Sequence, residues 1–289
     1  MSEQGNVTIP WLPWIDDNGK FEILQYVELT KSKIEQNNWG VVSNVTENGP
    51  SKMHVLDLRG ITMMTASLRY ILKKLDTAVY YRGQNKAWSL VPSLFRKKET
   101  TEERLAALHT MNSLLYHVKK HFSILVEDHV RAALAQHYKC PTNWLDIVDT
   151  PQMAAWFAYH QRVSYIAPDN GVAYILLLAA PKTSGNSHVQ VIDLRDSEPK
   201  WLRPHVQQAF SMRVFPDDGS IGSFDHVHLM TYIVPRPLLK AWSAYDAISV
   251  ETMFPNSTED LGRFESNIAQ GLLHDTEWKG IWHDPEIEI

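Results

Sequence analysis

The residues most suited to chemistry fall in two polar segments set among apolar residues, Tyr80–Gln84 and Gln136–Asp146. The first segment ends an aromatic run with Arg82 and follows it with Gly83, which would let the backbone turn or a ligand approach closely. Burying an unpaired guanidinium is costly, so Arg82 needs a carboxylate, carbonyl groups or an anionic ligand. Its planar fork suits two-point contact with phosphate or carboxylate. We predict that Arg82 binds an anion, with a salt bridge inside the core as the alternative.

The second segment groups His137, Thr142 and Asp146 around Pro141. We expect a turn between two apolar helices here, with backbone N–H groups turned toward an anion. His137 is a candidate general base or ligand contact, and Asp146 would orient it or pair with Arg82. The alternative is a polar network that only locks the two helices together.

A loop between these segments contributes a further cation. Trp88–Arg96 reads as an ordered loop anchored by Leu and Phe, with Arg96 near the mouth of the same cleft. The alternative leaves Arg96 in solvent on a loop packed against the core.

Several kinds of site are excluded by the sequence. The pair His226 and His228 and the helical pair His117 and His121 have no third ligand nearby, so no metal is predicted. There is no phosphate-cradling glycine loop, nucleophile elbow or dinucleotide fingerprint. Cys140 lies three residues from His137 around a proline, a doubtful geometry for a thiol nucleophile, so we interpret it as a small buried residue.

Composition places these residues in an ordinary globular chain. The 289 residues are 44% hydrophobic and 21% charged, with a net charge of −5, which disfavours coating nucleic acid by bulk charge. A single cysteine and the lack of a secretory pattern favour the cytosol. The longest apolar run, Val172–Pro181, is too short to span a membrane.

Periodicity predicts the elements that position the two segments. Residues 1–20 look like an arm pinned by its tryptophans, and Trp39–Pro50 looks like a loop. Helices are predicted over Phe21–Asn37, Thr65–Leu75, Gln152–Tyr159, Pro237–Tyr245 and Ser257–Leu273, and one or two helices over residues 100–136. The hydroxyl and early acids of Thr100–Glu103 and the pair Thr150-Pro151 mark two of these helix starts. Strands are predicted over Met53–Leu58, Thr77–Arg82, Val172–Leu178, His188–Leu194, Met212–Phe215 and His228–Val234. The fold class is therefore α+β, one unit with a helical first half packed on a mostly antiparallel sheet.

These motifs resemble the FRG domain, a family named for its Phe/Tyr-Arg-Gly motif. The resembling segments, in chain order, are Tyr81–Gln84, Leu90–Arg96, Gln136–Asp146, Ala154–Ala158, Gln207–Phe210 and Met253–Pro255. Lys139, Asn143 and Ile147-Val148 depart from the family pattern, which has Gly, Arg and Trp-Thr there. The resemblance implies an FRG domain over residues 75–262, N-terminal elements over 1–74 packed on it, and a C-terminal helix and tail over 263–289.

The layout also resembles ADP-ribosyltransferases, in which an early Arg or His holds a nicotinamide dinucleotide and a late Glu steadies the reacting ribose. By that resemblance Arg82 would grip the substrate and Glu251 would be the catalytic acid, with a solvated loop acid as the alternative for Glu251. Gln208 is a second candidate for the late position. The resemblance implies a nucleotide-linked transferase or a toxin-like defence effector in a prokaryotic cytosol, with a nicotinamide dinucleotide as substrate.

A binding module without turnover is the other hypothesis. It would recognise a small anionic ligand, a nucleotide or a nucleic-acid end through Arg82, Arg96 and the lysines at 97 and 98. Aromatic residues of the first segment or Trp88 would stack on the base. Under either hypothesis the ligand-binding residues are Tyr81, Gln84, Arg96, Thr142 and Gln208, and the catalytic candidates are Arg82, His137, Asp146 and Glu251.

Overall fold

The computed structural model divides the chain into two compact units, each made of three chain segments. Unit 1 contains Met1–Trp88, Thr150–Thr183 and Asp225–Ala247, and unit 2 contains Ser89–Asp149, Ser184–Phe224 and Ile248–Ile289. The structure describes residues 7–9, 12–15, 21–24, 27–29, 41–44, 51–55, 58–74, 76–122, 127–138, 140–160, 171–181, 189–198, 201–214, 224, 227–245 and 248–255. The predicted α+β class with a mostly antiparallel sheet is confirmed.

Unit 1 is built on a twisted sheet whose central strand is β12. The pairs β7–β9, β9–β12 and β5–β6 are antiparallel, and β12–β6 is parallel. Long apolar runs such as Ile175–Leu178 in β9 are buried, as expected of a strand with neighbours on both sides. In sheet order the strands are β7 (Thr77–Gln84), β9 (Val172–Pro181), β12 (His228–Pro235), β6 (Ser51–Val55) and β5 (Val41–Asn44).

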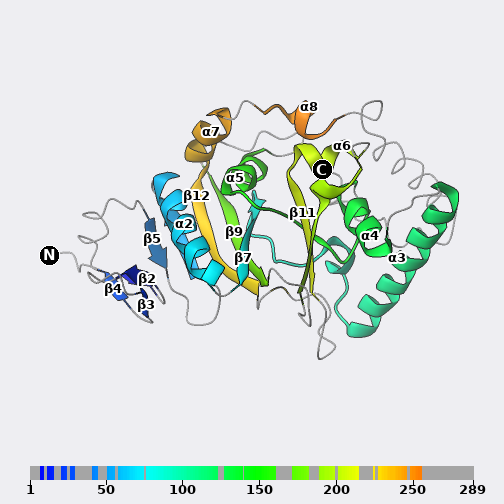
Figure 1. Ribbon diagram of the computed structural model, residues 1–289, viewed down its shortest axis with the longest axis horizontal. Coiled ribbons are helices and arrows are strands. Elements are labelled where there is room, and N and C mark those ends of the chain that lie inside the picture. Colours follow the sequence, from blue (N-terminus) through cyan, green and yellow to red (C-terminus); the bar gives the residue numbers. More distant parts are fainter. Residues whose placement is uncertain are drawn as a thin grey trace. The chain divides into compact units, whose positions relative to one another are not determined.

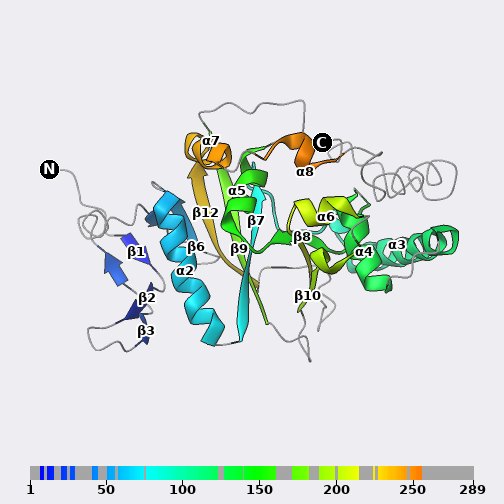
Figure 2. The same cartoon turned by 45° about the horizontal axis from the view of Figure 1, so that its top comes forward.

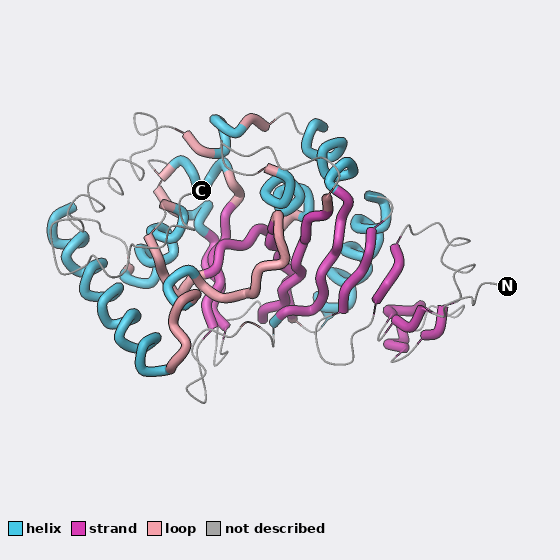
Figure 3. Tube along the Cα trace, turned by 180° about the vertical axis from the view of Figure 1, so that it is seen from behind, coloured by secondary structure: helices cyan, strands magenta, loops and turns pink. Residues whose placement is uncertain are grey.

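Three helices cover one face of this sheet. Figure 1 shows α2 (Leu58–Lys74) and α5 (Pro151–Tyr159) lying against the strands, and Figure 3 shows the strands in front of α2 when seen from behind. The third helix, α7 (Arg236–Tyr245), continues directly from β12 and packs against α5 (Figure 2). Unit 1 therefore has a sheet layer and a helix layer. Successive side chains of each strand point alternately toward the helices and toward the opposite face of the sheet.

The N-terminal residues of unit 1 form short strands in place of the predicted helix and loop. Strand β1 (Val7–Ile9) pairs with β4 (Val27–Leu29), and β2 (Leu12–Ile15) pairs with β3 (Phe21–Leu24). The helix predicted over Phe21–Asn37 is therefore wrong for its first half, and residues 30–37 lie outside the described residues. Strand β5 likewise lies within Trp39–Pro50, which we expected to be a loop. Phe, Ile and Val at these positions suit strands as well as helices.

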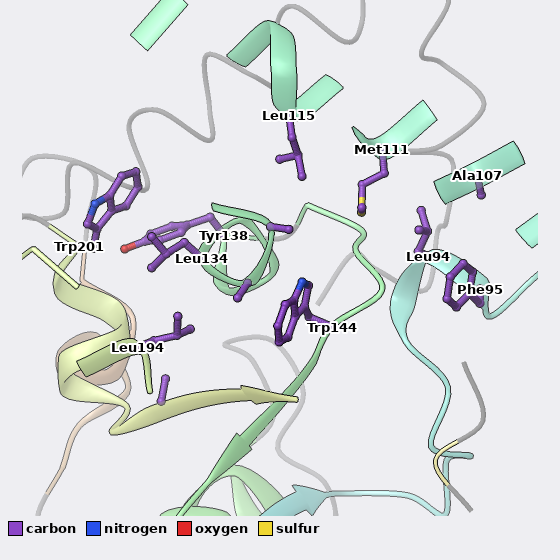
Figure 4. Packing of buried hydrophobic residues seen from close by; sticks show 13 residues of the cluster. Leu94, Phe95, Ala107, Met111, Leu115, Leu134, Tyr138, Trp144, Leu194 and Trp201 are labelled. Atoms are coloured by element: carbon purple, nitrogen blue, oxygen red, sulfur yellow. The ribbon is translucent and has the colours of Figure 1, made fainter. Parts of the chain in front are cut away.

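Unit 2 combines a three-stranded antiparallel sheet with helices. The strand order is β10 (Val189–Asp193), β11 (Ala209–Val214) and β8 (Leu145–Val148). The helices are α3 (Thr101–Phe122), α4 (Asp128–His137), α6 (Leu202–Val206) and α8 (Val250–Met253). The core gathers apolar residues from these helices, the 3-10 helix Ser93–Phe95 and the sheet, with Trp144 at its centre (Figure 4).

Two predicted helix starts are confirmed by their caps. At the start of α3, the Glu103 amide donates to Thr100 Oγ1 at 3.2 Å, and Thr100 N–H donates to the Glu103 carboxylate at 3.1 Å. These reciprocal bonds form a capping box. At the start of α5, Thr150 Oγ1 accepts from the Met153 amide at 3.3 Å, with Pro151 in the first turn. A hydroxyl with an acid three residues later thus located the start of α3, and a hydroxyl followed by proline located the start of α5.

The surroundings of the second polar segment differ from the prediction. Gln136–Asp146 joins helix α4 to strand β8, rather than one helix to another. Strand β8 was missed because it has only four residues, Leu-Asp-Ile-Val, and so short a run carries little periodic signal. The helix predicted over Ser257–Leu273 and the residue Lys139 lie outside the described residues. No described helix is long and apolar enough to cross a membrane.

Candidate functional site

Strand β7, which carries the Tyr-Arg-Gly motif, directs its residues to two different faces. Successive residues of a strand alternate sides, so Val79, Tyr81 and Gly83 share one face, and Tyr80 and Arg82 share the other. The first group faces helices α2 and α5: Arg69 of α2 lies over the Tyr81 ring at 5.4 Å, and Gly83 contacts α5. Arg82 is therefore turned away from the helix layer of unit 1.

Gly83 is needed for the packing of α5 rather than for the approach of a ligand. A Cβ atom at this position would overlap the Ala154 carbonyl oxygen and lie 2.7 Å from the Ala158 amide nitrogen. Both atoms belong to the α5 backbone, which cannot withdraw as a flexible side chain would. Small residues on the facing side of α5 complete this close contact. The glycine thus fixes the distance between α5 and the strand that bears Arg82.

The three binding candidates of unit 1 have different surroundings. Tyr81 is fully buried in the helix-facing layer. Arg82 is half-buried opposite Leu176 of β9. Gln84 follows on the same face as Arg82 and is only 7% exposed, and its Oε1 accepts no hydrogen bond from the residues that the structure describes. Arg82 and Gln84 thus present donor and acceptor groups side by side on one strand face.

In unit 2 the structure brings His137 and Asp146 together, which is one of the two pairings that the sequence left open for Asp146. His137 ends helix α4, and its Nε2 lies 3.3 Å from Asp146 Oδ1 on strand β8. The His137 side chain is 4% exposed and the Asp146 side chain 34%, although Asp146 Oδ1 itself is buried. The exposed area of the Asp146 side chain therefore falls on atoms other than Oδ1. A buried imidazole behind a partly exposed carboxylate is an arrangement suited to proton transfer or ligand contact.

The other ring nitrogen of His137 contacts a residue that the sequence reasoning missed. His137 Nδ1 lies 3.2 Å from Gln207 Oε1, across 70 residues of sequence. Gln207 Nε2 donates in turn to the Met253 carbonyl at 2.8 Å, which ties helix α8 to the histidine. We had singled out the neighbouring Gln208, which is exposed and has a φ of 48°. The turn at Gln208 places Gln207 inside and Gln208 outside.

A buried arginine holds the backbone around His137. Arg203 of α6 donates through Nη1 to the His137 carbonyl, one of the last carbonyls of α4. Its guanidinium lies 5.0 Å from the Tyr138 ring and 5.3 Å from the Phe254 ring. Helices α4, α6 and α8 are therefore joined at the point where the histidine leaves the helix.

Thr142 belongs to a second, internal hydrogen-bond network. Its hydroxyl donates to Gln136 Oε1 at 2.9 Å and accepts from the Trp144 amide at 3.2 Å. Ser93 donates to the same Gln136 oxygen at 3.0 Å. Thr142 is fully buried, so its hydroxyl holds the turn between α4 and β8 in place. Gln136 and Ser93 complete that turn, a role that the sequence did not predict for either residue.

Strand β11 adds a buried hydroxyl beside Asp146. Ser211 pairs with Asp146 in the register of β11 and β8, so their side chains share one face of the sheet. Ser211 is fully buried, and its Oγ has no hydrogen-bond partner among the described residues. A donor that can rotate thus lies next to the carboxylate. Only the pairing register reveals this neighbour, and the sequence does not give that register.

The remaining candidates lie at the surface of unit 2. Arg96 is exposed at the end of the 3-10 helix. Glu251 is exposed in the first turn of α8, whose N-cap Ser249 accepts a hydrogen bond from Thr252 N–H at 3.1 Å. A hydrogen bond from its own amide, assisted by the Ser249 side chain, lowers the pKa of the Glu251 carboxyl. Glu251 is therefore ionised at neutral pH, which suits stabilising positive charge rather than donating a proton.

Two other kinds of chemistry find little support in the described structure. Burial raises the pKa of the Cys140 thiol to about 12, so the thiolate needed by a nucleophile is scarce at neutral pH. Among the described residues, no group of three or more His, Cys, Asp and Glu could hold a metal ion.

The described residues form an α+β fold with a buried His137 beside a partly exposed Asp146 and a strand that carries Tyr81-Arg82-Gly83. Residues 77–165 match the family model of the FRG domain, and this stretch includes strands β7 and β8 and helices α3, α4 and α5. This stretch of the chain is therefore an FRG domain. Neither curated proteins nor solved structures gave a match. The match begins two residues from the predicted start, and the later boundary at residue 262 stays a prediction.

Proposed function

We propose that this FRG-domain protein is an ADP-ribosyltransferase-like enzyme that acts on a nicotinamide dinucleotide. The observation that supports it is the chain of contacts from Asp146 through His137 and Gln207 to the Met253 carbonyl. This chain ties α8, and with it Glu251, to a buried histidine–carboxylate pair. Glu251, the late acid of the proposed enzyme, is therefore on a helix that is linked by hydrogen bonds to His137, which lies beside Asp146. We place this activity in a prokaryotic cytosol, as a defence effector.

The proposed reaction breaks the bond between ribose C1′ and the nicotinamide nitrogen. The bonding electrons leave with nicotinamide, so positive charge develops on C1′ and the ribose ring oxygen. A nucleophilic atom of the acceptor then bonds to C1′ and loses a proton. The ionised Glu251 would stabilise the developing charge, and the Asp146–His137 pair would bind the ribose hydroxyls or take up the proton.

Arg82 is the proposed anion-binding residue of unit 1. Its guanidinium leaves β7 on the face opposite the helix layer, next to Gln84. A guanidinium forms two parallel hydrogen bonds to a phosphate, which lysine cannot do. Arg82→Lys should therefore weaken binding of a dinucleotide by about tenfold or more, measured by calorimetry.

Release of nicotinamide from labelled dinucleotide tests the enzymatic proposal. Glu251→Gln should lower the release rate by about 100-fold or more, while leaving the affinity for the dinucleotide within about threefold. Glu102→Gln is the matched control, because Glu102 is also an exposed acid in the first turn of a helix. A Glu251→Gln protein that still releases nicotinamide at the wild-type rate rules out the role given to this residue. A wild-type protein that neither binds nor cleaves the dinucleotide rules out the function itself.

A non-catalytic module that binds a nucleotide or nucleic-acid end is the second candidate. It is favoured by the exposure of Glu251, because a carboxylate in water stabilises positive charge weakly. The internal engagement of His137 and Thr142 points the same way. Dinucleotide binding without nicotinamide release, unchanged in Glu251→Gln, would select this module over the enzyme.

A further inference from the structure

Gln207 makes one hydrogen bond toward His137 and one away from it. Its Nε2 lies 2.8 Å from the Met253 carbonyl oxygen, and its Oε1 lies 3.2 Å from His137 Nδ1. The side chain is buried, so water does not compete for either contact. An amide with both ends engaged in this way cannot turn over without losing both bonds.

These contacts determine which nitrogen of His137 carries hydrogen. The Met253 carbonyl can only accept, so the amide NH2 group of Gln207 must face it. The amide oxygen then faces His137 Nδ1, and because this oxygen also can only accept, Nδ1 must be the donor. The other nitrogen, Nε2, is then an acceptor that lies 3.3 Å from Asp146 Oδ1, with no hydrogen bond between the two atoms.

The backbone of His137 is held independently of Gln207. Arg203 binds the His137 carbonyl and rests between the rings of Tyr138 and Phe254. These contacts hold the end of α4 and Phe254, the residue that follows α8. Gln207, in addition, holds the imidazole ring in one rotation about its side-chain bonds. Replacing Gln207 should therefore change the ring without removing the main anchor of the backbone.

We propose that Gln207 is a positioning residue that keeps hydrogen on His137 Nδ1, holds Nε2 toward Asp146, and couples this ring to helix α8. The assignment rests on the proposed function, in which a ligand meets the Asp146–His137 pair. Nε2, which is buried next to Asp146 Oδ1, is then the nitrogen free to take up a proton, and residues that contact a functional histidine through its other nitrogen commonly fix the tautomer in this way. Binding at Asp146 would be transmitted to α8, which carries Glu251, through two hydrogen bonds.

The ring orientation is tested by nitrogen NMR of the full-length protein labelled in its histidine side chains, in mildly alkaline solution. In the wild type, the His137 Nδ1 shift should be that of a hydrogen-bearing nitrogen. In Gln207→Met, which keeps the length and removes both polar groups, the hydrogen should move to Nε2, where it can be donated to Asp146. Gln152→Met, at an exposed position of α5, is the matched control and should leave the His137 signals unchanged.

A second variant separates the two hydrogen bonds. Gln207→Glu keeps an acceptor for Nδ1 but loses the donor to the Met253 carbonyl. It should retain hydrogen on Nδ1, while the amides of Met253 and Phe254, which bond within α8, exchange with solvent about tenfold faster. If Gln207→Met fails to fold, this variant alone decides the question.

The proposal is overturned if Nδ1 keeps its hydrogen in Gln207→Met, or loses it in Gln207→Glu. Unchanged amide exchange in α8 would likewise overturn the coupling. Both measurements use the free protein and no dinucleotide, so they succeed or fail independently of nicotinamide release. An absence of dinucleotide turnover with the expected NMR result would therefore reject the enzyme and keep the positioning role.

Discussion

Helices α4 and α5 end in nearly the same way in the two units, yet their terminal histidines are used differently. In unit 2, Arg203 binds the His137 carbonyl and lies over Tyr138, and in unit 1, Arg236 binds the Tyr159 carbonyl at 2.9 Å and lies over the Tyr159 ring. Both arginines are buried, and each satisfies a carbonyl that a helix end leaves unpaired.

The difference lies in what the histidine contacts. His160, just after α5, stacks on Trp156 at 4.1 Å, and its Nδ1 bonds the Trp156 carbonyl within the same helix end. His137 instead contacts side chains from two distant segments, Gln207 and Asp146. A histidine ring whose hydrogen bond and stacking partner both belong to its own helix contributes to packing alone. A ring oriented by separate segments is positioned by the whole unit, and this is the arrangement that chemistry requires.

The largest expected effect is on the packing of α5 against β7. Gly83→Ala should lower the free energy of unfolding by about 3 kcal/mol or more, because the added methyl meets the α5 backbone. The melting temperature should fall by roughly 6–12 °C, measured by circular dichroism. Adding Ala154→Gly should not rescue the variant, since the overlap is with the carbonyl of residue 154 and not its side chain. A rescue, or a change below about 1 kcal/mol, would contradict the close contact.

The two capping arginines test whether the helix ends are equivalent. Arg203→Met and Arg236→Met should each lower the free energy of unfolding by about 2 kcal/mol, because each leaves a buried carbonyl unpaired. Urea unfolding measures this loss, with the exposed Arg96→Met as a control that should stay within about 0.5 kcal/mol. Only Arg203→Met should also shift the His137 ring signals in NMR. An equal shift of the His137 signals in both variants would contradict the independence of the α4 and α5 ends.

The smallest expected effect concerns the pH dependence of His160. Burial lowers the pKa of His160 below the usual 6.5, more than the Trp156 carbonyl raises it, and the Arg236 charge lowers it further. The folded state therefore disfavours the protonated ring, so its stabilising contribution is present above about pH 6.5 and is lost as the pH falls through the folded pKa. Wild-type protein should lose more stability than His160→Gln on acidification, measured by urea unfolding at several pH values. Parallel pH curves for the two proteins would contradict this assignment.

Local features of the sequence predicted much of the structure. The capping pattern at Thr100 and Glu103, the Thr150-Pro151 start and the apolar run of β9 located those elements, because each depends on near neighbours. The pairing of His137 with Asp146 was one of the two that the sequence allowed, because the two residues are nine positions apart across one turn. The role of Gly83 was not predicted, because a glycine in a strand signals a close approach without saying what approaches.

Contacts between distant segments were beyond the reach of the sequence. Gln207 lies next to Gln208, and nothing in their identities tells which one is buried; the positive φ at Gln208 decides it. Ser211 gains its place beside Asp146 from a strand register that depends on the whole of unit 2. The composition of residues 145–148 suits a helix as well as a strand, and only their pairing with β11 makes them the strand β8.

The central strand of unit 1 is also among the last parts of that unit to be synthesised. Strand β12 joins β9 to β6, pairing Met230 with Ser51, so this sheet cannot close until residue 235 has left the ribosome. By then most of unit 2 has been translated, since its segments interrupt unit 1 twice. The early strands must wait with unpaired edges, which makes folding slow and exposes the nascent chain to aggregation. Truncated products ending before residue 228 should therefore depend on chaperones to remain in solution.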